Sequence, residues 1–515
     1  MVSGLAERLN VAAAFVDRHV AEGRGGRTAF RHAGRTLTYA GLAEQAGRAG
    51  AALAALGVEA GDRVLLVLDD VPAFAVAFWG AARLGAVAVP LNPLMSDEEY
   101  AFVLDDSRAA VVVAEPAVAA RLAALRPARA WPRAIVAAGG PAAGALDLGE
   151  LLAKASAPPP TAPTRPEDVV YWGYTSGSTG PPKAAVHTHA HFTAAADHVG
   201  VGVFGLGPDD LVFSASKMYF AFGLGNTLYF PARVGAAAVL AEGRIAPERA
   251  FAIIAAERPT AFFAVATLYA RMLEVPDAAR RFDLSSLRLC VSSGEALPAA
   301  VFDGWKARFG LELTDVVGST EALHDFIANR PGAARRGSAG QLVPGFEARL
   351  VDDAGQPVAD GAVGHLLIKG PTVAEGYWNR PDRTRSTMAG GWLRTGDMFR
   401  RDSDGHFYFA GRADDMLKVG GRWVSPAEVE ARLGEHPAVL EAGVVGATGA
   451  DGLMTPRAFV VLRSGVAGSP ALAAELAAFA RAGLAAYKAP RRIDFVADLP
   501  RTATGKVQRF RLRAP

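Results

Sequence analysis

Short apolar runs and longer stretches of helical periodicity alternate along most of this chain. Before Phe346, apolar runs such as Arg63–Leu68 and Ala109–Ala114 are separated by helical stretches such as Leu42–Leu56 and Pro72–Leu84. Apolar runs of this length are typical of strands buried on both faces, and strands that alternate with helices form parallel sheets. The pattern therefore predicts an α/β fold in which helices cover parallel sheets.

This alternation is interrupted once and then continues. The segment Ala142–Pro166 is rich in alanine and proline, and we predict a surface connection there. The other predicted elements of this part are strands at Ala86–Leu91, Val169–Trp172, Leu211–Ser214, Ala236–Leu240, Ala261–Val265 and Leu287–Val291, and helices at Glu98–Leu104 and Pro247–Glu257.

From Phe346 onward the pattern changes to short β segments separated by turns that contain aspartate and glycine. Further on, Ser425 followed by Pro426 and Glu428 predicts the capped start of a helix. We therefore predict a large domain over residues 1–411, with a β-rich subdomain at about 346–411, and a small α+β domain over residues 412–515. The predicted elements are strands at Phe346–Val351, His365–Ile368, His406–Phe409, Ala442–Val445, Arg457–Leu462 and Arg492–Val496, and a helix at Leu472–Ala486.

Composition narrows the class of protein. The chain has 515 residues, of which 51% are hydrophobic and 21% charged, and its formal net charge is +2. This balance is that of a globular protein and gives no reason to expect nucleic acid as a partner. Cys290 is the only cysteine, which excludes disulfides within the chain and thiolate-clustered metal sites. No secretory signal is visible, and the longest apolar run, Val71–Ala82, is too short to span a bilayer, so we expect a cytoplasmic protein without a membrane partner.

A stretch rich in glycine and hydroxyl groups is the first candidate site. It follows the strand Val169–Trp172 and contains Thr175, Ser176, Gly177, Ser178, Thr179, Gly180 and Lys183. Glycines let successive backbone amides face one anion, the hydroxyls add donors, and the lysine adds a positive charge. The P-loop spacing is absent, because Pro181–Pro182 separates the last glycine from the lysine. The stretch predicts a phosphate site of another kind, and a flexible surface turn is the alternative.

A second candidate lies where another predicted strand ends. The strand Leu287–Val291 leads into Ser292, Ser293, Gly294 and Glu295. Ligands of open α/β sheets gather at the carboxyl ends of strands, so this small polar turn is a candidate contact. A plain strand-to-helix turn is the alternative interpretation.

Five clusters occur in an order that resembles the adenylate-forming acyl-CoA synthetase family. They are the glycine-rich stretch, Gly318–Glu321, Gly391–Asp397, Gly411–Asp415 and Pro500–Lys506. The resemblance covers nearly the whole chain. It implies parallel α/β sheets with a small distorted β-barrel subdomain, followed by a small mobile C-terminal lid. It also implies that a carboxylate attacks the α-phosphate of ATP to give an acyl adenylate, from which the thiol of coenzyme A displaces AMP.

The resemblance also implies a role for each motif residue. Glu321 is the expected Mg²⁺ ligand, Thr320 bonds the α-phosphate, and Asp397 accepts from the ribose hydroxyls with the help of Arg412. The adenine is expected between Ser293–Glu295 and the strand that begins at Asp315, whose carboxylate faces the amino group. Lys506 bridges substrate carboxylate and α-phosphate until the lid rotates about Asp414. After that rotation, Lys418, Gly420 and Gly421 face the site during thioester formation.

Within this family the chain resembles the benzoate-CoA ligases. The stretches Ala221–Asn226, Gly318–His324, Asn329–Gly332 and Met416–Val419 carry this resemblance. A planar aryl acid requires a flat apolar slot with few polar groups. The expected walls of the aryl pocket are Phe220, Ala221, Phe222, Gly223, Gly318, His324 and Asp325. A role in the hydrophobic core is the alternative for the two phenylalanines.

Asp325 and Phe222 depart from the subgroup. Asp325 stands where the subgroup tends to carry an apolar residue, and Phe222 replaces a tyrosine. A carboxylate beside an aryl pocket is costly unless a group donates to it. The donor could be an amino or hydroxyl group on the ring or His324, and the alternative is that Asp325 turns towards solvent. We hypothesise that the acid is a substituted benzoate such as 2-aminobenzoate.

Other functions are compatible with the same motifs. An enzyme that loads an aryl acid onto a carrier protein would carry out the same first half-reaction, and a luciferase-like oxygenase is more remote. From another class, the chain could be an inactive adenylate-binding protein, although Lys506, Glu321 and Asp397 are all present. The expected small molecules are ATP, Mg²⁺, coenzyme A and an aryl carboxylate, and a homodimer is compatible with the sequence.

Overall fold

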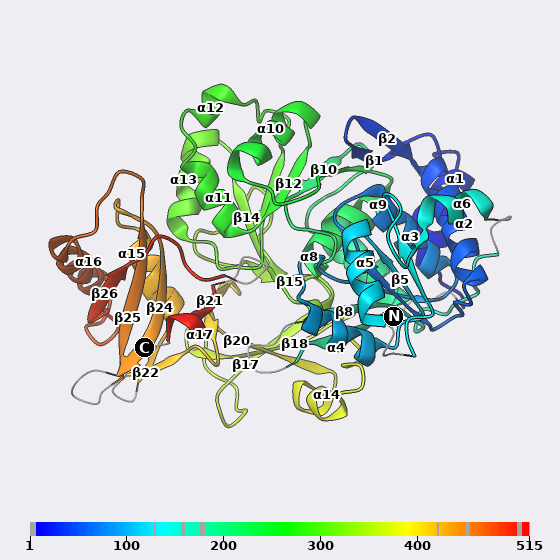
Figure 1. Ribbon diagram of the computed structural model, residues 1–515. Helices are drawn as coiled ribbons and strands as arrows, with labels where there is room; N and C mark the ends of the chain where they lie inside the picture. The colour runs from blue at the N-terminus through cyan, green and yellow to red at the C-terminus, as the bar shows by residue number, and fades with distance from the viewer. Residues whose placement is uncertain are drawn as a thin grey trace.

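A computed structural model describes residues 7–126, 130–155, 160–175, 181–419, 422–448, 454–501 and 507–513 of the protein. Two large sheets of mainly parallel strands lie side by side and are covered by helices, as Figure 1 shows. A five-stranded antiparallel sheet and a small C-terminal α+β domain follow. The predicted α/β class is therefore confirmed.

The first large sheet has seven strands in the order β7-β6-β5-β3-β4-β8-β9. Its strands are β3 (Arg63–Val67), β4 (Val87–Pro90), β5 (Val111–Ala114), β6 (Ala134–Ala137), β7 (Leu146–Asp147), β8 (Val169–Thr175) and β9 (Lys183–Thr188). Its helices are α2 (Tyr39–Ala55), α3 (Pro72–Arg83), α4 (Asp97–Ser107), α5 (Pro116–Leu125) and α6 (Leu148–Lys154). Strands β8 and β9 form an antiparallel hairpin at one edge, whereas the other pairs are parallel.

The second large sheet has nine strands in the order β16-β15-β14-β13-β12-β10-β11-β1-β2. The strands are β1 (Thr28–His32), β2 (Arg35–Thr38), β10 (Leu211–Ser214), β11 (Ala237–Leu240), β12 (Ala261–Ala264), β13 (Leu289–Ser292), β14 (Leu313–Gly318), β15 (Asp325–Ala328) and β16 (Gln341–Leu342). The helical elements of this part are η1 (Ala13–Asp17), α1 (Arg18–Ala21), α7 (His189–Ala195), η3 (Ala196–Val201), α8 (Ala221–Leu224), η4 (Gly225–Tyr229), α9 (Phe230–Val234), α10 (Pro247–Glu257), α11 (Ala266–Leu273), α12 (Ala278–Arg281), α13 (Ala299–Phe309) and η5 (Thr320–Ala322).

The β-rich part and the C-terminal domain complete the fold. The β-rich part contains β17 (Glu347–Val351), β18 (Val363–Lys369), α14 (Pro381–Thr387), β19 (Met388–Ala389), β20 (Trp392–Arg401) and β21 (Phe407–Arg412). A bridge between Gly340 and Phe407 joins its edge to the curled edge of the nine-stranded sheet. The C-terminal part contains β22 (Leu417–Val419), β23 (Arg422–Val424), α15 (Pro426–Gly434), β24 (Val439–Thr448), β25 (Met454–Leu462), α16 (Pro470–Gly483), β26 (Arg492–Phe495) and α17 (Arg509–Leu512).

The local sequence explains where the predicted elements begin and end. Helix α2 begins at Tyr39, three residues before the predicted start, because the Thr38 hydroxyl accepts a hydrogen bond from the Gly41 amide at 3.1 Å. It ends before Gly57, whose φ of +78° is left-handed. Ser425 caps α15 by accepting from the Glu428 amide at 3.0 Å, as predicted.

The prediction of a surface connection at Ala142–Pro166 is wrong in its first half. Strand β7 and helix α6 lie there, and Asp147 caps the helix by accepting from the Glu150 amide at 2.9 Å. Helix α6 packs against α2, so its few leucines form long-range contacts. The short helix was missed because its apolar periodicity covers less than two turns within an alanine- and proline-rich segment.

The C-terminal domain contacts the large domain through charged side chains. The guanidinium of Arg271 on α11 lies 3.0 Å from a carboxylate oxygen of Asp498, and Arg501 donates to the hydroxyl of Thr267 at 3.2 Å. Figure 1 shows the C-terminal domain beside α11 and α13 of the large domain. In the part of the chain that the structure describes, none of the helices is long and apolar enough to cross a membrane.

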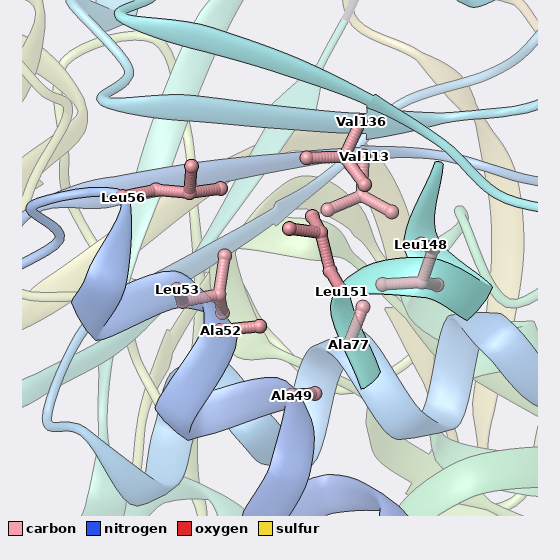
Figure 2. A pocket seen from close by; sticks show the side chains of 9 residues that line it. All are labelled: Ala49, Ala52, Leu53, Leu56, Ala77, Val113, Val136, Leu148 and Leu151. Atoms are coloured by element: carbon pink, nitrogen blue, oxygen red, sulfur yellow. The ribbon is translucent and has the colours of Figure 1, made fainter. Parts of the chain in front are cut away.

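An apolar void of about 10 Å³ lies between α2, α3, α6 and the seven-stranded sheet. Figure 2 shows the side chains that surround it, including Leu53 from α2, Ala77 from α3, and Leu148 and Leu151 from α6. A cavity of this size holds one water at most, and its walls offer no polar group to bind one. The void is therefore a packing defect of the core.

We expect Leu148→Ala to lower the free energy of unfolding by about 2–3 kcal/mol, because it enlarges this void and weakens the contact between α6 and α2. Thermal and denaturant unfolding would measure the change. Leu94→Ala is the matched control, because Leu94 is 81% exposed and its truncation should change stability by less than about 0.5 kcal/mol. Equal effects of the two substitutions would contradict a core role for α6.

Candidate active site

The β8–β9 hairpin carries the two ends of the predicted phosphate loop. Thr175 is the last residue of β8 and Lys183 the first of β9, and the hydroxyl of Thr175 donates to the Lys183 carbonyl at 3.4 Å. Ser176, Gly177, Ser178, Thr179 and Gly180 lie outside the described residues. The ends of the predicted loop are thus held together by the edge hairpin of the seven-stranded sheet.

Lys183 meets Glu321 through a tyrosine that the sequence analysis did not single out. The Lys183 ammonium donates to the hydroxyl of Tyr377 at 2.9 Å, and this hydroxyl donates to Glu321 at 2.8 Å. The ammonium lies 3.8 Å from the same carboxylate oxygen and 4.1 Å from the centre of the tyrosine ring. Burial lowers the pKa of Lys183, which Glu321 opposes, while burial and Glu321 raise the pKa of Tyr377. The three side chains form one half-buried charged group.

The turn that carries Thr320 and Glu321 is fixed by the neighbouring sheet. It forms the 3₁₀ turn η5 directly after β14, and His187 of β9 donates from Nε2 to the Thr320 carbonyl at 2.8 Å. His187 is fully buried, and burial holds its pKa well below the ordinary value, so the ring is a neutral donor. Gly173 of β8 is required here, because a Cβ atom would lie 2.3 Å from Cγ2 of Thr320.

Asp397 and Arg412 face each other across two antiparallel strands. They are paired in the register of β20 and β21, and the guanidinium donates to the carboxylate at 2.9 Å. The Nε atom of Arg412 lies 3.6 Å from a carboxylate oxygen of Asp414. The two residues of the predicted ribose pair therefore meet at the end of β21, and the predicted hinge residue Asp414 stands two positions after Arg412.

The predicted adenine contacts lie on adjacent strands. Ser293 and Gly294 follow β13, Asp315 lies on β14, and β13 pairs with β14 in parallel. Asp315 is buried, and burial together with the nearby charge of Asp325 raises its pKa well above the ordinary value. Glu295 accepts from the amide and hydroxyl of Thr267 at 3.1 and 2.7 Å and lies 3.5 Å from the guanidinium of Arg501. Its carboxylate thus connects α11 to the C-terminal domain.

The predicted aryl walls come from two segments that are far apart in the sequence. The rings of Phe222 and His324 lie 5.5 Å apart, and Nε2 of His324 lies 3.3 Å from the Phe222 carbonyl. Gly318 must lack a side chain, because a Cβ atom would lie 2.5 Å from the His324 carbonyl and 2.7 Å from Asp325. Phe222 is half-buried and packs against the main hydrophobic core, so it contributes both to this core and to the wall of the predicted aryl pocket.

Asp325 is buried, so the alternative that it turns to solvent is wrong. It is 2% exposed, and Oδ2 lies 2.8 Å from Nδ1 of His324 without the direction of a hydrogen bond. Its other oxygen accepts from the hydroxyl of Ser293 at 3.3 Å. Among the described residues, Asp325 Oδ2, Asp315 Oδ1 and the Tyr229 hydroxyl are buried without a hydrogen-bond partner. Such atoms are costly unless water or a ligand completes them.

Several predicted residues of the C-terminal domain lie wholly or partly outside the described part of the chain. Lys506, Gly420 and Gly421 lie outside the described residues, and only the backbone of Lys418 is described, in β22. Conversely, the structure adds three buried or half-buried groups that sequence analysis missed: Tyr377, His187 and Tyr229. The aromatic pair Tyr377–Trp378, which follows Gly376, was a visible signal, whereas nothing in the sequence pairs His187 with the distant Thr320.

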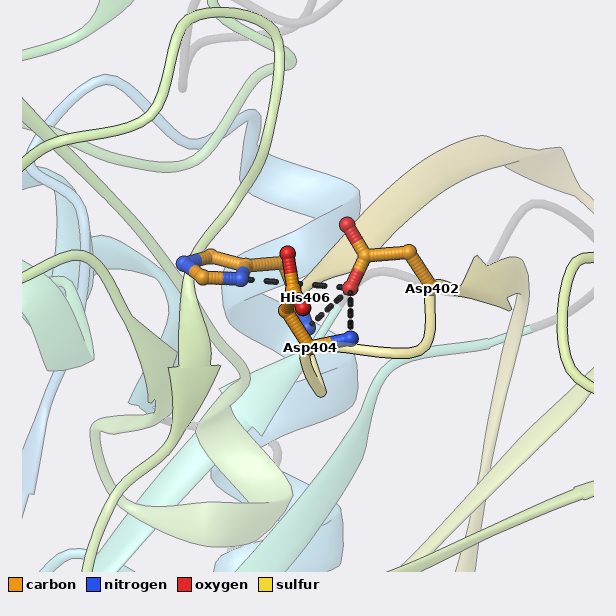
Figure 3. A group of neighbouring side chains, drawn as sticks. All are labelled: Asp402, Asp404 and His406. Carbon is orange, nitrogen blue, oxygen red and sulfur yellow. Dashed lines mark hydrogen bonds and ion pairs between the residues drawn. The ribbon is translucent and has the colours of Figure 1, made fainter.

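An acidic group on the β20–β21 turn resembles a metal site but already has a cation. Asp402, Asp404 and His406 lie together, as Figure 3 shows. The guanidinium of Arg335 lies 3.0 Å from both carboxylates and 3.1 Å from Nδ1 of His406. The arginine neutralises the group and joins this turn to the segment after β15.

Known proteins with similar sequences belong to the family that the motifs of this chain resemble. The chain matches the AMP-binding enzyme family over residues 17–378 and the AMP-binding enzyme C-terminal domain over residues 428–506. It is 44% identical to a benzoate–CoA ligase of Thauera aromatica over 510 residues, which are 99% of this chain and 96% of the relative.

Two solved structures are similar throughout. The crystal structure of the anthranilate CoA ligase AuaEII in complex with anthranoyl-AMP has a TM-score of 0.95 and 39% identity, covering 99% of this chain and 97% of that one. The structure of a benzoate CoA ligase from Burkholderia xenovorans LB400 has a TM-score of 0.91 and 43% identity, covering 98% and 100%.

The chain therefore belongs to the AMP-binding enzyme family, the adenylate-forming enzymes that the order of its motifs indicated. Within this family it belongs to the benzoate–CoA ligase subgroup, since the full-length similarity extends over both domains.

We expect Tyr377→Phe to weaken ATP binding by about 10-fold, because it removes a hydroxyl that is bonded to two charged groups. Isothermal titration of ATP against both proteins would measure the dissociation constant. Tyr408→Phe is the matched control, since its hydroxyl donates to Asp402 at 2.9 Å on the β20–β21 turn. Unchanged ATP affinity in Tyr377→Phe would exclude this hydroxyl from the nucleotide site.

Proposed function

We propose that the protein is an ATP-dependent, AMP-forming aryl-CoA ligase. It would activate a benzoate-type acid as the aryl adenylate and transfer the aroyl group to coenzyme A. The observation that carries this proposal is that the charged group of Lys183, Tyr377 and Glu321 lies at the end of the phosphate loop. The similarity to benzoate– and anthranilate–CoA ligases supports the acid and the acceptor.

Each residue of the candidate site has a separate role in the first half-reaction. Lys183 and the loop offset the charge of the triphosphate, and groups that are already oriented stabilise developing charge without reorganisation. Glu321 suits Mg²⁺, because a hard cation prefers carboxylate oxygen and only one oxygen of Glu321 accepts from Tyr377. When bound, the ion would neutralise phosphate charge. Asp397 would accept from the ribose hydroxyls, while Arg412 holds its carboxylate in place.

The C-terminal domain supplies the remaining charge in this proposal. Lys506 would bridge the acid and the α-phosphate, and rotation about Asp414 would then bring Lys418 and the following glycines to the site. Support comes from Arg501, which lies five residues before Lys506 and contacts both Thr267 and Glu295 of the large domain. The lid segment is thus seated beside the turn that is expected to hold adenine.

The acid of this proposal is an aminobenzoate such as 2-aminobenzoate. Asp325 supports it, because a buried carboxylate with an uncommitted oxygen can accept from a ring amino group. Ser293 holds the other oxygen, so the uncommitted one has a defined direction. Nδ1 of His324 lies 2.8 Å from this oxygen but without the direction of a hydrogen bond, so the oxygen can still accept from a ligand. An unsubstituted benzoate would leave the oxygen without a donor.

We also expect the enzyme to be cytoplasmic, with a homodimer as a possible assembly. A cytoplasmic enzyme has direct access to ATP and coenzyme A, and the lone Cys290 is buried and unpaired by any disulfide. A homodimer is compatible with this chemistry, and size-exclusion chromatography with light scattering would determine the assembly.

The function is tested by incubating the protein with ATP, Mg²⁺, coenzyme A and a panel of benzoates. We expect stoichiometric AMP, pyrophosphate and aroyl-CoA, with consumption of free thiol. Lys506→Ala should slow pyrophosphate release by at least about 100-fold, because the attacking carboxylate and α-phosphate then repel each other without a bridging charge. Conversion of preformed aryl adenylate to the thioester is the control. Adenylate formation without thiol consumption would instead favour a carrier-loading enzyme.

We expect Asp325→Ile to lower the preference for 2-aminobenzoate over benzoate, measured as the ratio of kcat/KM values, by about 10-fold. The reason is the loss of the acceptor for the ring amino group. Asp325→Asn keeps the shape of the side chain and should give an intermediate ratio. A ratio that does not move in either variant would refute this role of Asp325.

A further inference from the structure

A buried charged group lies at the junction of the two large sheets and is separate from the group of Lys183, Tyr377 and Glu321. The ammonium of Lys217 lies 2.7 Å from a carboxylate oxygen of Asp69 and 3.9 Å from one of Asp70, and it also contacts the Ala241 carbonyl. Asp69 and Asp70 follow β3 of one sheet, whereas Lys217 follows β10 of the other. Lys217 is 7% exposed and Asp70 is 1% exposed.

Asp70 also holds the backbone of the other sheet. Its Oδ1 atom accepts from the Met218 amide at 2.9 Å, a charge-assisted hydrogen bond between residues that are 148 positions apart. Asp69 accepts from the Gly243 amide at 2.5 Å, so the group also reaches the end of β11. These bonds fix residues 217 and 218 relative to both sheets.

The segment fixed in this way continues directly into the predicted aryl wall. Residues 217–220 form a turn in which the Phe220 amide donates to the Lys217 carbonyl at 3.0 Å. Gly223 closes over the same turn, because a Cβ atom there would lie 2.1 Å from the Lys217 carbonyl. Phe220 and Phe222 therefore take their positions from a backbone that is anchored at Lys217 and Met218.

We propose that Asp70 and Lys217 are positioning residues for the aryl acid: the bond of Asp70 to the Met218 amide, together with the buried Lys217 beside Asp69 and Asp70, sets the backbone that carries Phe220 and Phe222, and thereby determines the affinity for the aryl ring. Neither side chain takes part in the chemistry. The inference rests on the proposed function, since it assigns the segment 220–223 to the aryl pocket.

The charges around Asp70 make this anchor sensitive to pH. Burial raises the pKa of Asp70 to about 7, Lys217 and the Met218 amide lower it, and the charge of Asp69 raises it. The titratable groups that face this cluster are Asp69, Glu115, Lys217 and Tyr219. Above pH 7 the ionised carboxylate accepts strongly from the amide, and below pH 7 the bond loses its charge. The KM for the aryl acid should therefore fall as the pH rises from 6 to 8.

The raised pKa of Asp70 has the opposite effect on folding stability, which falls as the pH rises. The folded protein binds the Asp70 proton more tightly than the unfolded chain, whose carboxyl has a pKa near 4. Folding stability is therefore lost between about pH 4 and pH 7 as the pH rises. Asp70→Asn removes this cost, so its melting temperature relative to the wild type should be higher at pH 8 than at pH 5.

The opposite effects of pH on aryl-acid affinity and on folding stability distinguish a positioning role of Asp70 from a merely structural one. We expect Asp70→Asn to raise the KM for the aryl acid about 10-fold at pH 8, with kcat and the KM for ATP nearly unchanged and without a lower melting temperature. Its KM for the acid should not vary between pH 6 and 8. Asp17→Asn is the control, because it neutralises a carboxylate that accepts from Arg83 at 2.5 Å at the C-terminal end of α3, whereas Asp70 precedes the start of this helix.

The outcomes are distinguishable from those of the proposed function. If the wild type forms no aroyl-CoA from any benzoate, the proposed function fails before the variant is compared. If the wild type is active and Asp70→Asn keeps its KM and pH profile, the positioning role is refuted. A rise in KM that is matched by a fall in kcat and in melting temperature would also refute it, because that pattern indicates general destabilisation.

Discussion

Buried contacts between strand ends of the two large sheets hold the candidate site together. A charge or polar group that leaves water must find a partner of suitable geometry, and a strand end cannot supply one by itself. Asp69 and Asp70 after β3 meet Lys217 after β10, and Gly173 of β8 lies against Thr320 after β14. These cross-sheet contacts align the ends of the two sheets, and the candidate site lies where they meet.

The electrostatic design differs between the two ends of the site. At the phosphate end, Lys183 and Tyr377 are hydrogen-bonded in a chain to the half-buried Glu321. This charged group fits the binding of a triphosphate. At the aryl end the walls are apolar, but Asp325 and His324 form a buried pair among them. A purely apolar slot would accept any flat acid, whereas a buried acceptor discriminates between rings through the cost of an unpaired group.

The small domain is held by a few ion pairs at its edge. Arg271 pairs with Asp498, and Arg501 contacts Thr267 and Glu295. Contacts of this kind are weak individually where they are exposed to solvent, and they can be exchanged for others. This arrangement is what a lid requires, because a large apolar interface would prevent rotation between two half-reactions.

The sequence by itself determined the class of fold, the order of the motifs and the family. Apolar strands and capped helices depend on local periodicity, so Pro247–Glu257 and Leu211–Ser214 have the predicted bounds. The small helix α6 was missed because its apolar partners lie on α2, a hundred residues earlier. Only the tertiary structure decided that Asp325 is buried, that Tyr377 joins Lys183 to Glu321, and that Asp70 bonds Met218. Each of these depends on distances between segments that no local pattern encodes, because burial and pairing arise only when the sheets pack together.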